Sequence, residues 1–178
     1  MNAHTRSKTV AACVTAVAAL LLGTYAHADG APKKLTLSVI IDADGGPEVL
    51  KGKYAQAIKQ LTAGFDTSDT VGISTNLCVA LIMSRQWEAA QVTCDKAVSY
   101  ARFSYHDSNL GGFSGRNATE ALAYSNRAVL DSLTSRPEAA KKDVARAHAL
   151  DPRTEFVSQN WLALNGQQTG PVIAAVAR

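Results

Sequence analysis

The hydrophobic pattern of residues 138–152 is that of an amphipathic helix whose inner face is mostly alanine. The apolar positions recur every three or four residues, which places them on one side of a helix. They are Ala140, Val144, Ala147 and Leu150. Small side chains on that face let a second helix approach to the short end of the packing range, about 8 Å between axes. The pattern therefore predicts a closely packed pair of helices.

The second helix of the pair is expected directly upstream, in residues 121–133. Tyr124 and Ala128 lie on one apolar stripe of that segment, and larger aliphatic residues lie on another. Ser135 and Arg136 interrupt the pattern, and Pro137 then stands in the first turn of the following helix, where its missing N–H is harmless. Because the connection is so short, the two segments are predicted to form an antiparallel hairpin.

The same pattern occurs twice more upstream. The positions taken by Pro137, Ala140, Val144 and Ala147 are taken in a middle copy by Trp87, Ala90, Cys94 and Ala97, and in a partial copy by Tyr54, Ala57, Leu61 and Gly64. Ala57 and Ala90 are 33 residues apart, whereas Ala90 and Ala140 are 50 apart. The larger interval indicates an insertion of about 16 residues, which falls at residues 105–120.

A period near 34 residues, built of paired helices, resembles the tetratricopeptide repeat. The alanine that this family places between its two helices falls on Ala57, Ala90 and Ala140, and its closing proline falls on Pro152 but is replaced by Arg102 in the middle copy. The resemblance implies an all-α fold of antiparallel helix hairpins, a right-handed α-solenoid. It would comprise a half repeat (47–64), a repeat (71–104), the inserted loop (105–120), a repeat (121–154), a capping helix (155–166) and a tail (167–178).

A strand-like segment precedes the helical region. Apolar residues from Leu35 to Ile41 alternate with Thr36 and Ser38, the period-two pattern of a half-buried strand. Two interpretations are open: an extended arm (29–46) lying on the first helix, or an edge that pairs with a partner. We favour the arm.

Residues 1–28 have the pattern of a secretory signal peptide. Arg6 and Lys8 precede an apolar run, which ends in the small-x-small cleavage pattern Ala26-His27-Ala28. Cleavage after Ala28 would release a periplasmic or secreted protein without stable membrane insertion. It would leave 16 basic residues against 15 acidic ones, which is too balanced a charge for a nucleic-acid-binding domain.

No catalytic, metal or cofactor site is expected. Residues 42–46 begin like a calcium loop, but the closing ligands are missing and a turn is the better interpretation. His106 and Asp107 lack further partners for a triad or a metal site. Cys78 and Cys94 lie on the two helices of one hairpin, where a disulfide and a pair of buried thiols are both open. We therefore do not expect an enzyme.

The expected function is binding of a protein or peptide on the concave side of the repeats. The side chains predicted to line that side are Asn76, Val79, Ile82, Asn126, Val129 and Leu133. Asn126 matches an asparagine with which some members of the family grip a peptide carboxylate, although Gly72 and Thr75 stand where a basic residue would complete such a clamp.

Two further interpretations concern other surfaces. The inserted loop carries Phe113 and Arg116, which either contact a partner or belong to a plain connection. The alternative function is that of a structural, envelope-homeostasis protein whose repeats mediate self-association, so that the short array of repeats completes its core in a homodimer.

Overall fold

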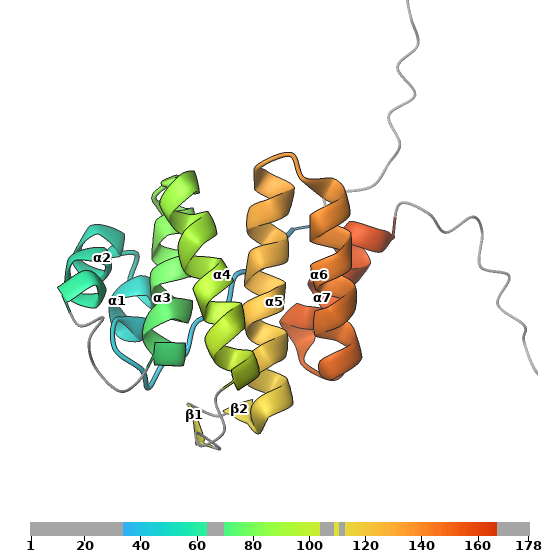
Figure 1. Ribbon diagram of the computed structural model, residues 1–178, viewed down its shortest axis with the longest axis horizontal. Coiled ribbons are helices and arrows are strands. Elements are labelled where there is room, and N and C mark those ends of the chain that lie inside the picture. Colours follow the sequence, from blue (N-terminus) through green and yellow to red (C-terminus); the bar gives the residue numbers. More distant parts are fainter. Residues whose placement is uncertain (1–33, 64–69, 104–108, 111–112, 167–178) are drawn as a thin grey trace, which may run out of the picture. The chain divides into compact units, whose positions relative to one another are not determined.

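The computed structural model describes residues 34–63, 70–103, 109–110 and 113–166. Within them the chain is helical apart from an extended N-terminal segment, the connecting turns and one minimal hairpin, which confirms the all-α prediction (Figure 1). The helices are α1 (Gly46–Leu50), α2 (Tyr54–Ala63), α3 (Thr70–Met83), α4 (Trp87–Phe103), α5 (Arg116–Leu133), α6 (Pro137–Leu150) and α7 (Glu155–Asn165). The predicted signal peptide, Gly64, residues 105–107 and the tail 167–178 lie outside the described residues.

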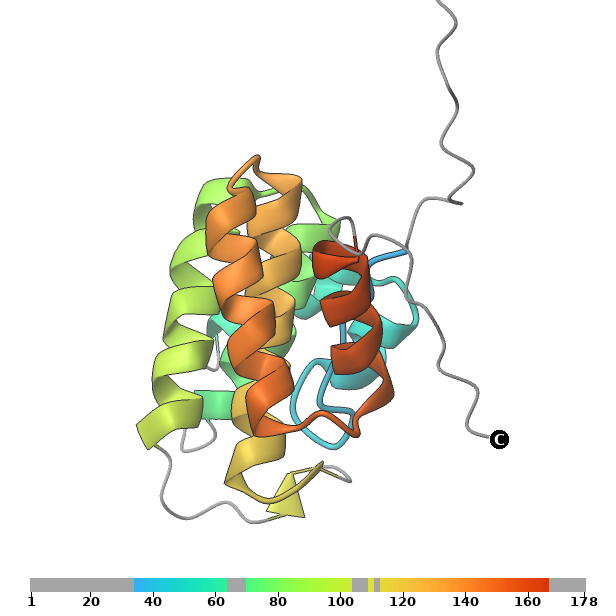
Figure 2. The same ribbon diagram turned by 90° about the vertical axis from the view of Figure 1, so that its right-hand side faces the viewer.

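Two helix hairpins, α3–α4 and α5–α6, form the centre of the described region. Each turn contains a residue with positive φ, Arg85 at 57° and Ser135 at 59°. In each, the next amide closes the helix end, since Gln86 donates to the Leu81 carbonyl at 3.0 Å and Arg136 to that of Asp131 at 2.8 Å. The two turns thus have the same geometry, as the sequence pattern predicts, and Figure 2 shows the hairpins side by side.

The alanines of the repeated pattern lie in the helix interfaces. Ala57, Ala90 and Ala140 are all 0% exposed, and α3 packs on α4, α4 on α5, and α5 on α6. A larger side chain at these positions would separate the helices, because packed interiors leave no free volume. Small residues therefore determine the close approach of α3 to α4 and of α5 to α6.

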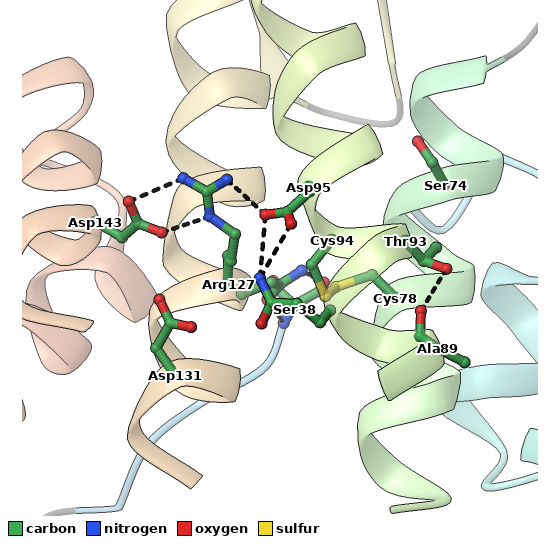
Figure 3. The surroundings of a disulfide bond; sticks show 12 residues. Ser38, Ser74, Cys78, Ala89, Thr93, Cys94, Asp95, Arg127, Asp131 and Asp143 are labelled. Atoms are coloured by element: carbon green, nitrogen blue, oxygen red, sulfur yellow. Dashed lines mark hydrogen bonds and ion pairs between the residues drawn. A yellow bond between two sulfur atoms is a disulfide. The ribbon is translucent and has the colours of Figure 1, made fainter. Parts of the chain in front are cut away.

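Cys78 of α3 and Cys94 of α4 form a disulfide with their Cα atoms 5.0 Å apart. Both are essentially inaccessible to solvent, at 1% and 0% exposed. Of the two states that the sequence leaves open, the structure therefore contains the bridged one, which ties the first full hairpin together (Figure 3).

The insertion is shorter than predicted. Helix α5 begins at Arg116 rather than at Ala121, so the last five residues assigned to the loop are helical. Thr119 and Glu120 are buried there, at 6% and 3% exposed, and this added contact explains why the helix extends beyond its apolar pattern. Before it, β1 (Asn109–Leu110) pairs antiparallel with β2 (Phe113–Ser114).

A turn lies between the arm and α1, as predicted for residues 42–46, but it spans residues 41–45 because Gly46 already begins α1. The Ala43 amide donates to the Ile40 carbonyl at 3.2 Å, and the Gly46 amide donates to the Ala43 carbonyl at 3.1 Å. A Cβ at Gly46 would lie 2.4 Å from the Ile40 oxygen, so only glycine fits this close approach. The turn lets the arm and α1 both lie against α3.

Candidate binding site: the arm and the groove beside it

The arm, residues 34–40, crosses α3, α5 and α7 instead of lying on the first helix (Figure 1, blue trace behind the helices). Three asparagines hold it, one from each helix. The Asn160 side chain accepts from the Thr36 amide and donates to the Thr36 carbonyl, both at 2.7 Å. Asn126 does the same for Ser38 at 2.9 and 2.7 Å. Our expectation that the arm lies on the first helix was therefore wrong.

Asn76 completes this asparagine ladder, which we define as Asn76, Asn126 and Asn160. It exchanges two hydrogen bonds of 2.9 Å with Ile40 and donates a third, of 3.0 Å, to the Asp44 carbonyl. The three side chains are 0–1% exposed. Because a carboxamide can donate and accept at once, each asparagine pairs with the arm as a neighbouring strand would.

The ladder engages every second residue of the arm, which is the signature of an extended chain. Its hydrogen bonds to the arm are all to backbone atoms, so they do not depend on the arm's side chains. Asn76 and Asn126 were predicted as groove residues, but Asn160 was missed. It lies 34 residues after Asn126, so the repeat period itself was the signal that could have found it.

An apolar groove of about 1070 Å³ runs along the arm. The arm forms one wall, and the others come from α1, α3, α5, the starts of α2 and α4, and Gln159 of α7. The lining includes Leu35, Leu37, Val39, Ile41, Val49, Leu50, Tyr54, Val79, Ile82, Met83, Trp87, Val129 and Leu133. A peptide-sized apolar channel thus lies beside a backbone that is already held in extended form.

Four of the residues predicted to contact a partner line this groove, namely Val79, Ile82, Val129 and Leu133. Asn76 and Asn126 instead hold the arm. The other two predicted contacts lie elsewhere. The backbone of Phe113 pairs with Leu110, and Arg116 Nη2 donates to the Arg102 carbonyl at 2.8 Å.

The charged residues that line the groove are Lys34 and Arg85, and no carboxylate is among its lining residues. Asp95 of α4, Asp131 of α5 and Asp143 of α6 line a separate hollow. There Arg127 pairs with Asp143 at 2.6 Å and with Asp95 at 2.9 Å (Figure 3). Burial lowers the pKa of Arg127, whereas its hydrogen bonds and ion pairs with Asp143 and Asp95 raise it. The two carboxylates together outweigh burial, so the pKa of Arg127 lies above its ordinary value. This cluster joins three helices and is lined separately from the groove.

Among the described residues, no three His, Cys, Asp or Glu side chains are grouped so as to hold a metal ion. The described helices include none with the length and apolarity needed to cross a membrane. Comparison of the chain with protein-family models, curated proteins and solved structures gave no significant match.

Proposed function

We propose that this domain is a non-enzymatic binding module that takes an extended peptide or protein segment into the groove beside the arm. In this proposal the helix hairpins form a short tetratricopeptide-like solenoid, with the asparagine ladder on its concave side. The recurrence of asparagine on α3, α5 and α7, at intervals that match the repeat and its insertion, supports that arrangement.

The observation that carries the proposal is the exposure of large apolar side chains around the groove. Ile41, Leu50, Met83 and Leu133 are between 47% and 60% exposed, and all four line it. Apolar side chains that converge on one concavity are characteristic of a binding surface, whereas single exposed ones are common everywhere. The groove is therefore suited to bind a partner through apolar side chains.

A charge placed in the groove tests the proposal. Leu133→Glu introduces a carboxylate at a side chain that is 53% exposed, so the fold should tolerate it, while burial of a charge against an apolar partner is costly. Val92→Glu is the matched control, since Val92 is 56% exposed on α4 and is not a lining residue. The probe is a library of peptides about six residues long, the usual length of a strand, with aliphatic residues at alternate positions.

We expect the wild type and Val92→Glu to enrich the same peptides and Leu133→Glu to lose them at least tenfold. Equal enrichment by all three would contradict binding in the groove. Solution mass measured on the same samples tests the alternative, self-association: a dimer that only Leu133→Glu dissociates would make the groove an interface between two copies.

Export is part of the proposal. The bridged Cys78 and Cys94 are compatible with an oxidising compartment, and with the predicted signal peptide they support a periplasmic or secreted location. N-terminal sequencing of the protein recovered from the cell envelope or the medium tests cleavage and export, with Asp29 as the expected first residue.

A further inference from the structure

The arm has two hydrogen-bonding edges, and the asparagine ladder occupies one of them. In an extended chain, successive residues direct their N–H and C=O groups to opposite sides. Thr36, Ser38 and Ile40 direct theirs to the asparagines. The backbone groups of Leu37 and Val39 must therefore point to the other edge.

That second edge is unpaired within the part of the chain that the structure describes. The N–H and C=O groups of Leu37 and Val39 make no hydrogen bond to any described residue. The arm is half-buried there and not covered, since residues 35–39 all retain partial exposure. An unpaired edge of this kind is a template on which another strand can form.

We propose that the partner segment adds to this edge as a β-strand. This inference rests on the proposed function, because it specifies how a peptide in the groove would be held. The added strand would lie about 4.8 Å from the arm, and its alternate side chains would stand on the same face as Leu37 and Val39. That face lines the groove, so the partner's aliphatic residues would be buried there.

The charges of the groove add a second feature to the partner. Its charged lining residues, Lys34 and Arg85, are both cationic. An acidic side chain or a free terminal carboxylate on the partner would complement them, and a lysine would be disfavoured. The occupant is thus an extended segment with alternating aliphatic residues and a carboxylate.

Backbone N-methylation of the probe peptide separates strand addition from side-chain binding. A peptide enriched by the wild type is made in two forms, with N-methyl groups on the odd or on the even residues. The two forms have the same composition, and each loses the N–H donors of only one edge. Strand addition on the arm requires one edge alone, so one form should bind at least tenfold more weakly than the other.

A pair of arm variants tests the same contact from the protein side. Leu37→Pro removes an outward N–H and leaves the amides bound to the ladder in place, and proline suits an edge position of this kind. Leu37→Ala is the control, because it loses the side chain but keeps the N–H. One lost hydrogen bond predicts about tenfold weaker binding for Leu37→Pro than for Leu37→Ala.

The outcomes distinguish the two proposals. If the unmethylated peptide binds, loses affinity with Leu133→Glu, and shows equal affinity in its two methylated forms, groove binding stands and strand addition is wrong. If the wild type enriches no peptide from the library, both proposals are wrong. Exchange of acid for lysine at the end of the bound peptide should weaken binding, and stronger binding would overturn the charge argument.

Discussion

Ser38 and Asn126 are 88 residues apart in the chain and exchange two hydrogen bonds, at 2.9 and 2.7 Å. The contact is between one amide side chain and both polar groups of one backbone residue. Thr36 with Asn160 and Ile40 with Asn76 have the same relationship. The arm is therefore a structural element of the helical domain, because it ties three helices together through its own backbone.

Removal of the central asparagine should loosen the arm. Asn126→Ala leaves the N–H and C=O of Ser38 without partners in a half-buried position, which should lower the free energy of unfolding by about 1–3 kcal/mol. Urea denaturation measures the loss. Hydrogen exchange should show the Ser38 amide exchanging faster in the variant, because that amide has lost its hydrogen bond to Asn126 and the arm opens locally at a lower cost in free energy.

Asn165→Ala is the control for that substitution. Among the described residues, the Asn165 side chain donates only to the Trp161 carbonyl of its own helix, at 3.2 Å, so its loss should change stability by less than about 0.5 kcal/mol. Equal effects at Asn126 and Asn165 would show that the ladder contributes nothing particular to the arm.

How well the sequence predicts each part of this architecture depends on whether the contacts of that part recur at a regular spacing along the chain. The alanines at positions 57, 90 and 140 predict the interfaces correctly because helix contacts recur every three or four residues. Helix α7 is likewise predicted within a residue, as the capping helix 155–166, from the apolar residues Phe156, Trp161, Leu162 and Leu164. Local spacing is sufficient in both cases.

The binding site could be predicted only in part, since its contacts are long-range. The alternation of residues 35–41 indicates an extended segment, but nothing local indicates that Asn76, Asn126 and Asn160 would bind it. Their pairing with the arm depends on how α3, α5 and α7 are arranged side by side. A comparison of polar residues at the repeat period would have found all three asparagines, although not their partner.

The interface alanine of α6 should tolerate no enlargement. Ala140 is 0% exposed against α5, so Ala140→Leu should destabilise the protein by about 1–3 kcal/mol through overpacking. Ala139 is exposed next to it, and Ala139→Leu should be nearly neutral. Thermal unfolding of the two variants checks the difference. A tolerated leucine at position 140 would mean that the helices are not closely packed there.

The disulfide should contribute to stability by closing a short loop. Cys78 and Cys94 are 16 residues apart, and the chain-entropy model gives about 3 kcal/mol for a loop of that size. The double variant Cys78→Ala, Cys94→Ala should lose about that amount in urea denaturation. Treatment with a reductant should lower the stability of the wild type and leave the double variant unchanged. If the reductant affects neither protein, the bridge is absent in solution.

Asp131 should make stability depend on pH with a sign opposite to that of most carboxylates. It is 3% exposed and pairs with Arg136 at 2.5 Å. Burial raises its pKa above the ordinary 3.8 although Arg136 lowers it. The folded protein then holds this proton more tightly than the unfolded chain does, so the contribution of Asp131 to stability falls as the pH rises from about 3.8 through the folded-state pKa.

Asp131→Asn tests this dependence, because the asparagine side chain cannot ionise and escapes this loss of stability. Relative to wild type, the variant should therefore have a larger free energy of unfolding at pH 7 than at pH 3, as measured in urea titrations. A difference in the other direction would mean that Arg136 outweighs burial at this site.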